Sequence, residues 1–200
     1  MESIIKEFIK KNNEPYQRYN SWCHCYDAFG KLTNSNNLAL HLGFYLASWG
    51  MYRGSSNLLQ KDYLVHIDAV KIIKSFDYLS CFNGKDVIRD NLADILELIN
   101  QLSEYYKNEH DISPTDTLIS KIVLGTLGCL PAFDRLFIDG VKSEKQSFKT
   151  LKSKSLNRLF DFVENTKELE ILKHKYNQYP VMKLVDMYFW QIGYNLALKT

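Results

Sequence analysis

Apolar residues recur at intervals of three and four along most of the chain, which is the spacing of one face of an α-helix. Glycine, proline and asparagine interrupt this pattern and mark turns between the segments. No segment shows the strict alternation of apolar and polar residues that indicates a strand. The pattern therefore predicts an all-α fold, a bundle of about eight to ten helices. The predicted helices are a first one that Ser3 could cap, followed by 16–29, 38–49, 57–76, 85–107, 115–125, 131–141, 147–163, 166–176 and 181–198.

The last predicted helix is apolar around most of its circumference, so it needs cover on every side. We expect it to lie buried at the centre of the bundle. A helix of this kind would not be stable with only two short companions, so the polar stretch 142–147 is not expected to divide the chain. Residues 1–200 are therefore predicted to form a single helical domain.

Composition sets only wide limits on function. A chain of this length buries roughly 70% of its unfolded surface, enough for one sizeable core. The net charge of +2 neither demands nor excludes a nucleic-acid partner. The N-terminal residues lack the apolar core of a signal peptide, and the apolar stretch 38–49 is too short to span a bilayer. We expect a cytoplasmic protein with reduced thiols, no membrane partner and no cofactor.

Cys23, His24 and Cys25 are consecutive, which raises the question of zinc. Structural zinc sites space paired ligands by two to four residues and use two such pairs, whereas this chain has no second pair. We therefore predict no metal site and expect the thiols to be packing residues. Trp22 and His24 remain candidate ligand-binding residues.

A second candidate site surrounds Arg53, which lies between Gly50 and Gly54 in a predicted turn. Ser55 or Ser56 could cap the helix that follows, and a helix start presents free N–H groups to an anion. Arg53 could hold a phosphate or carboxylate in a bidentate contact. The alternative is a structural corner in which Arg53 pairs with an aspartate.

Two carboxylates could complete such a site. Asp134 is predicted in the first turn of helix 131–141, where it either complements the helix dipole or acts as a catalytic acid. Asp186 lies on the apolar last helix and must find a partner there. Arg53 and Arg135 are the candidate partners. We hypothesise that the turns at Arg53 and Asp134 meet near Asp186 in one polar, ligand-binding cleft.

A basic stretch follows, with a local charge of six minus one, or +5, since Glu144 is its only acid. The spacing of Lys142, Lys145, Lys149 and Lys152 predicts one shared helical face. Such a face suits contact with a nucleic-acid backbone, although it is also typical of a solvated surface. The candidate nucleic-acid-binding residues are Lys142, Lys145, Lys149, Lys152, Lys154 and Arg158.

Four stretches, 18–26, 46–56 with its ASWGMYRGSS motif, 125–137 with GTLGCLPAFDR, and 183–193, resemble a family of uncharacterised bacterial proteins. This resemblance implies no activity; it places Trp22, Arg53, Asp134 and Asp186 in the family's common scaffold. A looser similarity is to helix-hairpin-helix DNA glycosylases, with 126–131 as the hairpin and Asp134 or Asp139 as the acid. Here the glycines are three rather than two residues apart, and no lysine nucleophile lies at a matching position.

Three functions remain open at this point. The first is a module that binds an anionic ligand, either nucleic acid or a nucleotide. The second is an enzyme that acts on a nucleic-acid base with Asp134 as its acid. The third is a protein-interaction module without chemistry, for example in phage defence, which would bind through an exposed aromatic face.

Overall fold

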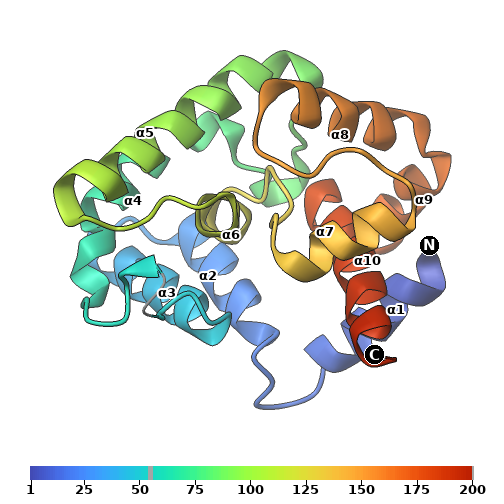
Figure 1. Ribbon diagram of the computed structural model, residues 1–200, viewed down its shortest axis with the longest axis horizontal. Coiled ribbons are helices and arrows are strands. Elements are labelled where there is room, and N and C mark those ends of the chain that lie inside the picture. The colour runs from blue at the N-terminus through green and yellow to red at the C-terminus, as the bar shows by residue number, and fades with distance from the viewer. Residues whose placement is uncertain (54–55, 200) are drawn as a thin grey trace.

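Ten α-helices make up most of residues 1–53 and 56–199, the part of the chain that the computed structural model describes (Figure 1). No strand occurs among these residues, and none of their helices is both long and apolar enough to cross a membrane. The predicted all-α bundle is confirmed. The helices are α1 (Glu2–Asn12), α2 (Asn20–Lys31), α3 (Ser35–Ser48), α4 (Ile67–Ser75), α5 (Leu92–His110), α6 (Asp116–Thr126), α7 (Arg135–Ser143), α8 (Ser153–Asn165), α9 (Lys167–Lys175) and α10 (Val181–Ala197).

Side-chain caps fix several of the helix starts. The Asn34 side chain accepts a hydrogen bond from the N–H of Asn37, and Thr115 accepts one from Leu118. Each cap satisfies an N–H group that has no partner within its helix. The predicted start of helix 57–76 is wrong. Residues 57–62 are not helical, so the expected helix 57–76 is reduced to a 3₁₀ turn, Tyr63–His66, followed by α4.

Two helices form the centre of the core. The residues of α10 are buried over most of its length, which confirms the predicted buried C-terminal helix. Helix α6 is equally enclosed, since every residue from Leu118 to Thr126 is buried. It is seen along its axis near the centre of Figure 1. The sequence pattern did not single out α6, although it contains a lysine within an otherwise apolar run.

Helices α7 and α10 approach each other unusually closely. A Cβ atom built on Gly140 of α7 would overlap the carbonyl oxygen of Phe189, and one built on Gly193 of α10 would overlap that of Leu136. Glycine is therefore required on both helices, because no side chain fits between the two backbones. This contact fixes α7, and with it Arg135, against the central helix.

The basic stretch does not form the predicted helical face. Helix α7 ends at Ser143 and α8 begins only at Ser153, so the residues between them are not helical. Lys145 adopts a left-handed backbone conformation with φ 55°, Lys149 lies in the connecting segment, and Lys152 is the N-cap of α8. Phe148 and Leu151 are buried, so burial of apolar side chains by the connection has overridden the local lysine periodicity.

Candidate anion-binding cleft

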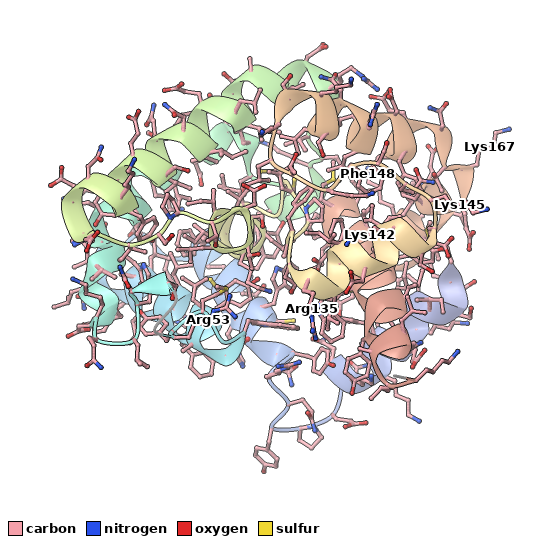
Figure 2. All side chains as sticks on the ribbon, in the orientation of Figure 1. Arg53, Arg135, Lys142, Lys145, Phe148 and Lys167 are labelled. Atoms are coloured by element: carbon pink, nitrogen blue, oxygen red, sulfur yellow. The ribbon has the colours of Figure 1, made fainter. Side chains whose placement is uncertain are left out.

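The turn after α3 and the start of α7 border one open cleft with a volume of about 360 Å³. Arg53 lies in the turn, Arg135 is the first residue of α7, and both side chains are labelled in Figure 2. Arg18, which precedes α2, lines the same cleft. Trp49 and Trp190 also line it, with their rings edge to face and their centroids 5.6 Å apart. Residues far apart in the sequence thus surround a single opening.

The three arginines of the cleft, Arg18, Arg53 and Arg135, are exposed to solvent. None of them forms an ion pair with a carboxylate of the described residues. The guanidinium of Arg18 lies 4.9 Å from the centroid of the Trp49 ring, a cation–π contact. The alternative prediction, in which a structural aspartate pairs with Arg53, is therefore not what the described residues show.

Lys121 and Asp134 form an ion pair in the wall of the cleft. The Nζ atom of Lys121, a residue only 4% exposed, lies 2.8 Å from Oδ2 of Asp134. The other oxygen, Oδ1, accepts a hydrogen bond from the N–H of Phe137 at 3.0 Å. Asp134 is therefore the N-cap of α7, and the prediction that helix 131–141 begins at Pro131 and places Asp134 within its first turn is wrong. Both carboxylate oxygens are engaged within the chain.

Asp186 forms a second buried pair, but not with an arginine. Its Oδ2 lies 2.8 Å from Nζ of Lys183, one turn earlier on α10, and its Oδ1 accepts from the N–H of Ala132 at 3.0 Å. The predicted partners, Arg53 and Arg135, are thus wrong. A buried carboxylate needs a close cation and further hydrogen bonds, and Asp186 obtains both from the scaffold.

A small recess that shares Asp134 with the cleft is lined by both ion pairs and by Tyr45. Burial, followed by the nearby Asp186 carboxylate, raises the pKa of the Tyr45 hydroxyl, so this group stays neutral. The two ammonium groups and two carboxylates cancel one another. The net charge of +3 at the cleft therefore comes from its three arginines, which are free to meet a ligand.

Trp22 and His24, predicted as ligand-binding residues, do not line the cleft. Trp22 is 2% exposed, and its Nε1–H donates a hydrogen bond to the carbonyl of Leu124 at 2.9 Å. The Nζ atom of Lys183 lies 5.0 Å from the centroid of its ring. Trp22 thus supports the buried ion pair of Lys183, whereas His24 points to solvent on α2.

The serines after Arg53 do not build the predicted helix start. Ser55 lies outside the described residues. Ser56 is buried, and its hydroxyl contacts the carbonyl oxygens of Met51 and Arg53, so it turns the chain instead of capping a helix. The next helical element with described bounds is the 3₁₀ turn Tyr63–His66. An anion in this cleft would therefore meet guanidinium groups and the start of α7, but no helix start at Ser55 or Ser56.

The basic residues predicted to bind nucleic acid do not line the cleft. In the view of Figure 2, Arg53, Arg135, Lys142 and Lys145 follow one another across the molecule. Lys142 is paired with Asp139 at 3.4 Å, while Lys145 is exposed. Lys152, Lys154 and Arg158 are exposed at and within the first turns of α8, and Lys149 is half-buried.

The segment compared with a DNA-binding hairpin is enclosed by the protein. All residues from 118 to 133 are buried, including Gly128, whose φ of 69° closes the turn after α6. A hairpin that holds a phosphate must expose its backbone N–H groups, and this one does not. In the described part of the chain, no group of three or more His, Cys, Asp or Glu side chains could hold a metal ion.

Comparison of the chain with protein-family models, with curated proteins and with solved structures finds no match. The geometry and charge of the cleft therefore carry the functional argument.

Seven of the residues that line the cleft were not predicted from the sequence, among them Arg18, Trp49, Lys121 and Trp190. One of them carried a usable signal. Lys121 interrupts the apolar run of α6, and a lysine so placed requires a buried carboxylate partner. Arg18 had no such signal, because it lies in an irregular segment and reaches the cleft only through the fold.

Proposed function

We propose that this protein binds an anionic ligand in the cleft, specifically a nucleotide or the phosphate groups of a nucleic acid. The observation that carries this proposal is the convergence of Arg18, Arg53 and Arg135, from three separate segments, without a carboxylate partner among the described residues. Like charges repel, so three unpaired guanidinium groups around one opening are stabilised by an anion between them. Guanidinium also matches the geometry of phosphate in a bidentate contact.

The aromatic wall suggests what accompanies the phosphate. The guanidinium of Arg18 and the ammonium of Lys121 each lie 4.9 Å from the centroid of the Trp49 ring. Its indole Nε1–H is buried and has no hydrogen-bond partner in the described part of the chain. A base with acceptor atoms can bond to this group, and the volume of the cleft falls in the range of about 300–1,000 Å³ that small ligands occupy.

The proposal assigns Asp134 a positioning role, because both of its oxygens already bond to Lys121 and Phe137. It holds Lys121 at the cleft and is not a free acid or base. The exposed Lys145 and the lysines near α8 would extend the attraction to a longer nucleic acid. The cytoplasm, where nucleotides and nucleic acids are abundant, is the proposed location.

The test is a titration of the full chain with a fluorescein-labelled single-stranded oligonucleotide, followed by anisotropy and by competition with adenosine monophosphate. Three phosphate contacts predict that log K falls with log salt concentration with a slope of about −2. Arg53→Gln and Arg135→Gln should each weaken binding about tenfold or more, because each removes charge-assisted hydrogen bonds.

Lys107→Gln is the matched control, since it removes one positive charge from α5, which contributes nothing to the cleft. Equal weakening by Lys107→Gln and Arg53→Gln would show that only overall charge matters, which contradicts a site. Absence of binding at low salt would also reject the proposal. Competition by the monophosphate would indicate that the cleft suffices, and its failure would indicate that the basic segment takes part.

A further inference from the structure

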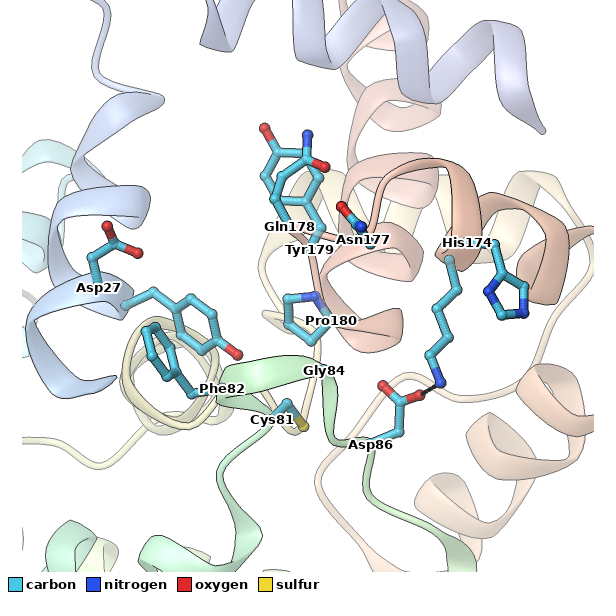
Figure 3. A pocket seen from close by; sticks show the side chains of 12 residues that line it. Asp27, Cys81, Phe82, Gly84, Asp86, His174, Asn177, Gln178, Tyr179 and Pro180 are labelled. Carbon is cyan, nitrogen blue, oxygen red and sulfur yellow. Dashed lines mark ion pairs between the residues drawn. The ribbon is translucent and has the colours of Figure 1, made fainter. Parts of the chain in front are cut away.

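A second cavity, of about 700 Å³, opens on another part of the molecule (Figure 3). It lies between α2, the segment 81–86 and residues 173–180 at the end of α9. None of the arginines of the anion-binding cleft lines it. The cavity is therefore a separate feature, and its chemistry is independent of the proposed function.

Tyr26 places an unsatisfied hydroxyl in the wall of this cavity. The residue is only 5% exposed, and its ring stacks on Trp22 with centroids 4.7 Å apart. Its hydroxyl has no hydrogen-bond partner among the described residues. A buried hydroxyl without a partner costs about 1–3 kcal/mol, so this group favours a ligand that supplies the missing bond. Burial also raises the pKa of Tyr26, which keeps it a neutral donor and acceptor.

The charges around the cavity leave no net charge to attract an ion. Asp27 is paired with Lys31 at 2.7 Å and Asp86 with Lys173, so each carboxylate at the cavity has its own cation. Asp86 is paired with Lys173, an interaction drawn as a dashed line in Figure 3, and it also accepts from the N–H of Val181. This arrangement presents a strong acceptor and a strong donor next to each other.

The exposed rim adds two amides, Asn177 and Gln178, which both donate and accept hydrogen bonds. Carboxylates only accept, an ammonium only donates, and the Tyr26 hydroxyl does both. A ligand that satisfies all of these groups must itself both donate and accept at several neighbouring positions without carrying a charge. Vicinal hydroxyl groups have this property.

We propose that the cavity binds an uncharged sugar ring with vicinal hydroxyls, either as a free glycoside or as the ribose of a nucleoside. One hydroxyl bonds to the Tyr26 oxygen, and the Asp86–Lys173 pair receives a neighbouring diol. The volume suits a ligand of this size, and Phe82 and Pro180 supply apolar surface for the ring carbons.

The experiment is isothermal titration of the full chain with uridine, 2′-deoxyuridine and methyl glucoside. At least one ligand with a vicinal diol should bind, and Tyr26→Phe should weaken that binding about fivefold to tenfold, the effect of one hydrogen bond. The melting temperature of the free variant should not fall, because the deleted hydroxyl has no partner within the described chain. This second measurement separates a ligand-binding role from a structural one.

Tyr16→Phe is the matched control, since Tyr16 is fully exposed and does not line the cavity. A second variant, Asn177→Trp, changes an exposed rim position and should block the cavity without disturbing the core. Arg53→Gln should leave this binding unchanged, so a failure here is distinguishable from a failure at the anion-binding cleft.

Each possible result either supports or overturns the proposal. Tighter binding of uridine than of 2′-deoxyuridine supports the diol and points to a nucleoside, while binding of methyl glucoside points to a free glycoside. Binding that Tyr26→Phe or Asn177→Trp leaves unchanged overturns the proposal. So does the absence of binding by all three ligands up to about 10 mM, a concentration at which even a weak site fills.

Discussion

The stability of the protein should fall as the solution becomes acidic, because of a single buried histidine. His66 is fully enclosed between two tyrosines, with Nε2 2.9 Å from the hydroxyl of Tyr52 and Nδ1 2.7 Å from that of Tyr106. Burial, and secondarily the charge of His110, lowers the pKa of His66 to about 3. In the folded protein the imidazole is therefore neutral at any mildly acidic pH.

The size of this loss of stability follows from the difference between the pKa of His66 in the folded and in the unfolded protein. An unfolded histidine titrates near pH 6.5, so between pH 6.5 and about 3 the unfolded chain binds a proton that the native protein does not. The free energy of unfolding then decreases as pH falls, by about 1.4 kcal/mol per pH unit. The contribution of His66 is fully retained above pH 6.5, and about 2 kcal/mol of it is lost at pH 5.

Urea unfolding at pH 7 and at pH 5, at constant ionic strength and followed by tryptophan fluorescence, measures this loss. His66→Gln keeps hydrogen-bonding capacity but does not titrate, so the difference in stability between the unmodified chain and this variant should shrink by about 2 kcal/mol from pH 7 to pH 5. His24→Gln, at an exposed position, is the matched control for replacing a histidine by glutamine. An identical pH dependence in the unmodified chain and in His66→Gln would refute the reasoning.

Two further substitutions test the scaffold that positions the cleft. Gly193→Ala forces a methyl group against the carbonyl oxygen of Leu136 and should lower the free energy of unfolding by about 1–3 kcal/mol in urea melts; an unchanged midpoint would contradict the close helix contact. Lys183→Met leaves Asp186 as a buried carboxylate without its cation and should cost about 3–5 kcal/mol at pH 7. Adding Asp186→Asn to Lys183→Met should recover part of that loss, and further destabilisation instead would argue against the ion pair.

The sequence predicted the helices better than the cleft. Helical periodicity depends on neighbours three and four residues away, so α3, α6, α9 and α10 were found within a few residues of their ends. The start of α7 was missed because proline is favoured at the first position of a helix, which suggested Pro131, whereas Asp134 caps the helix through the N–H of Phe137.

The ion-pair partners of the charged residues were harder to predict from the sequence than the helices. Asp186 was assigned to a distant arginine although Lys183 lies one helical turn away on α10. Long-range placement of Arg18 and Trp190 depends on how α2 and α10 pack, which no local pattern encodes. The predicted helical face of the basic stretch was wrong for a related reason. Its lysines follow a helical spacing, but the segment folds as an irregular connection that buries its apolar residues.

The glycine contact between α7 and α10 also limits how a guest can enter the cleft. With no side chain between the two backbones at Gly140 and Gly193, neither helix can slide along the other without a collision. Arg135 and Trp190 therefore form one rigid wall of the cleft. A bulky ligand could enter only through movement of the opposite wall, the turn that contains Arg53.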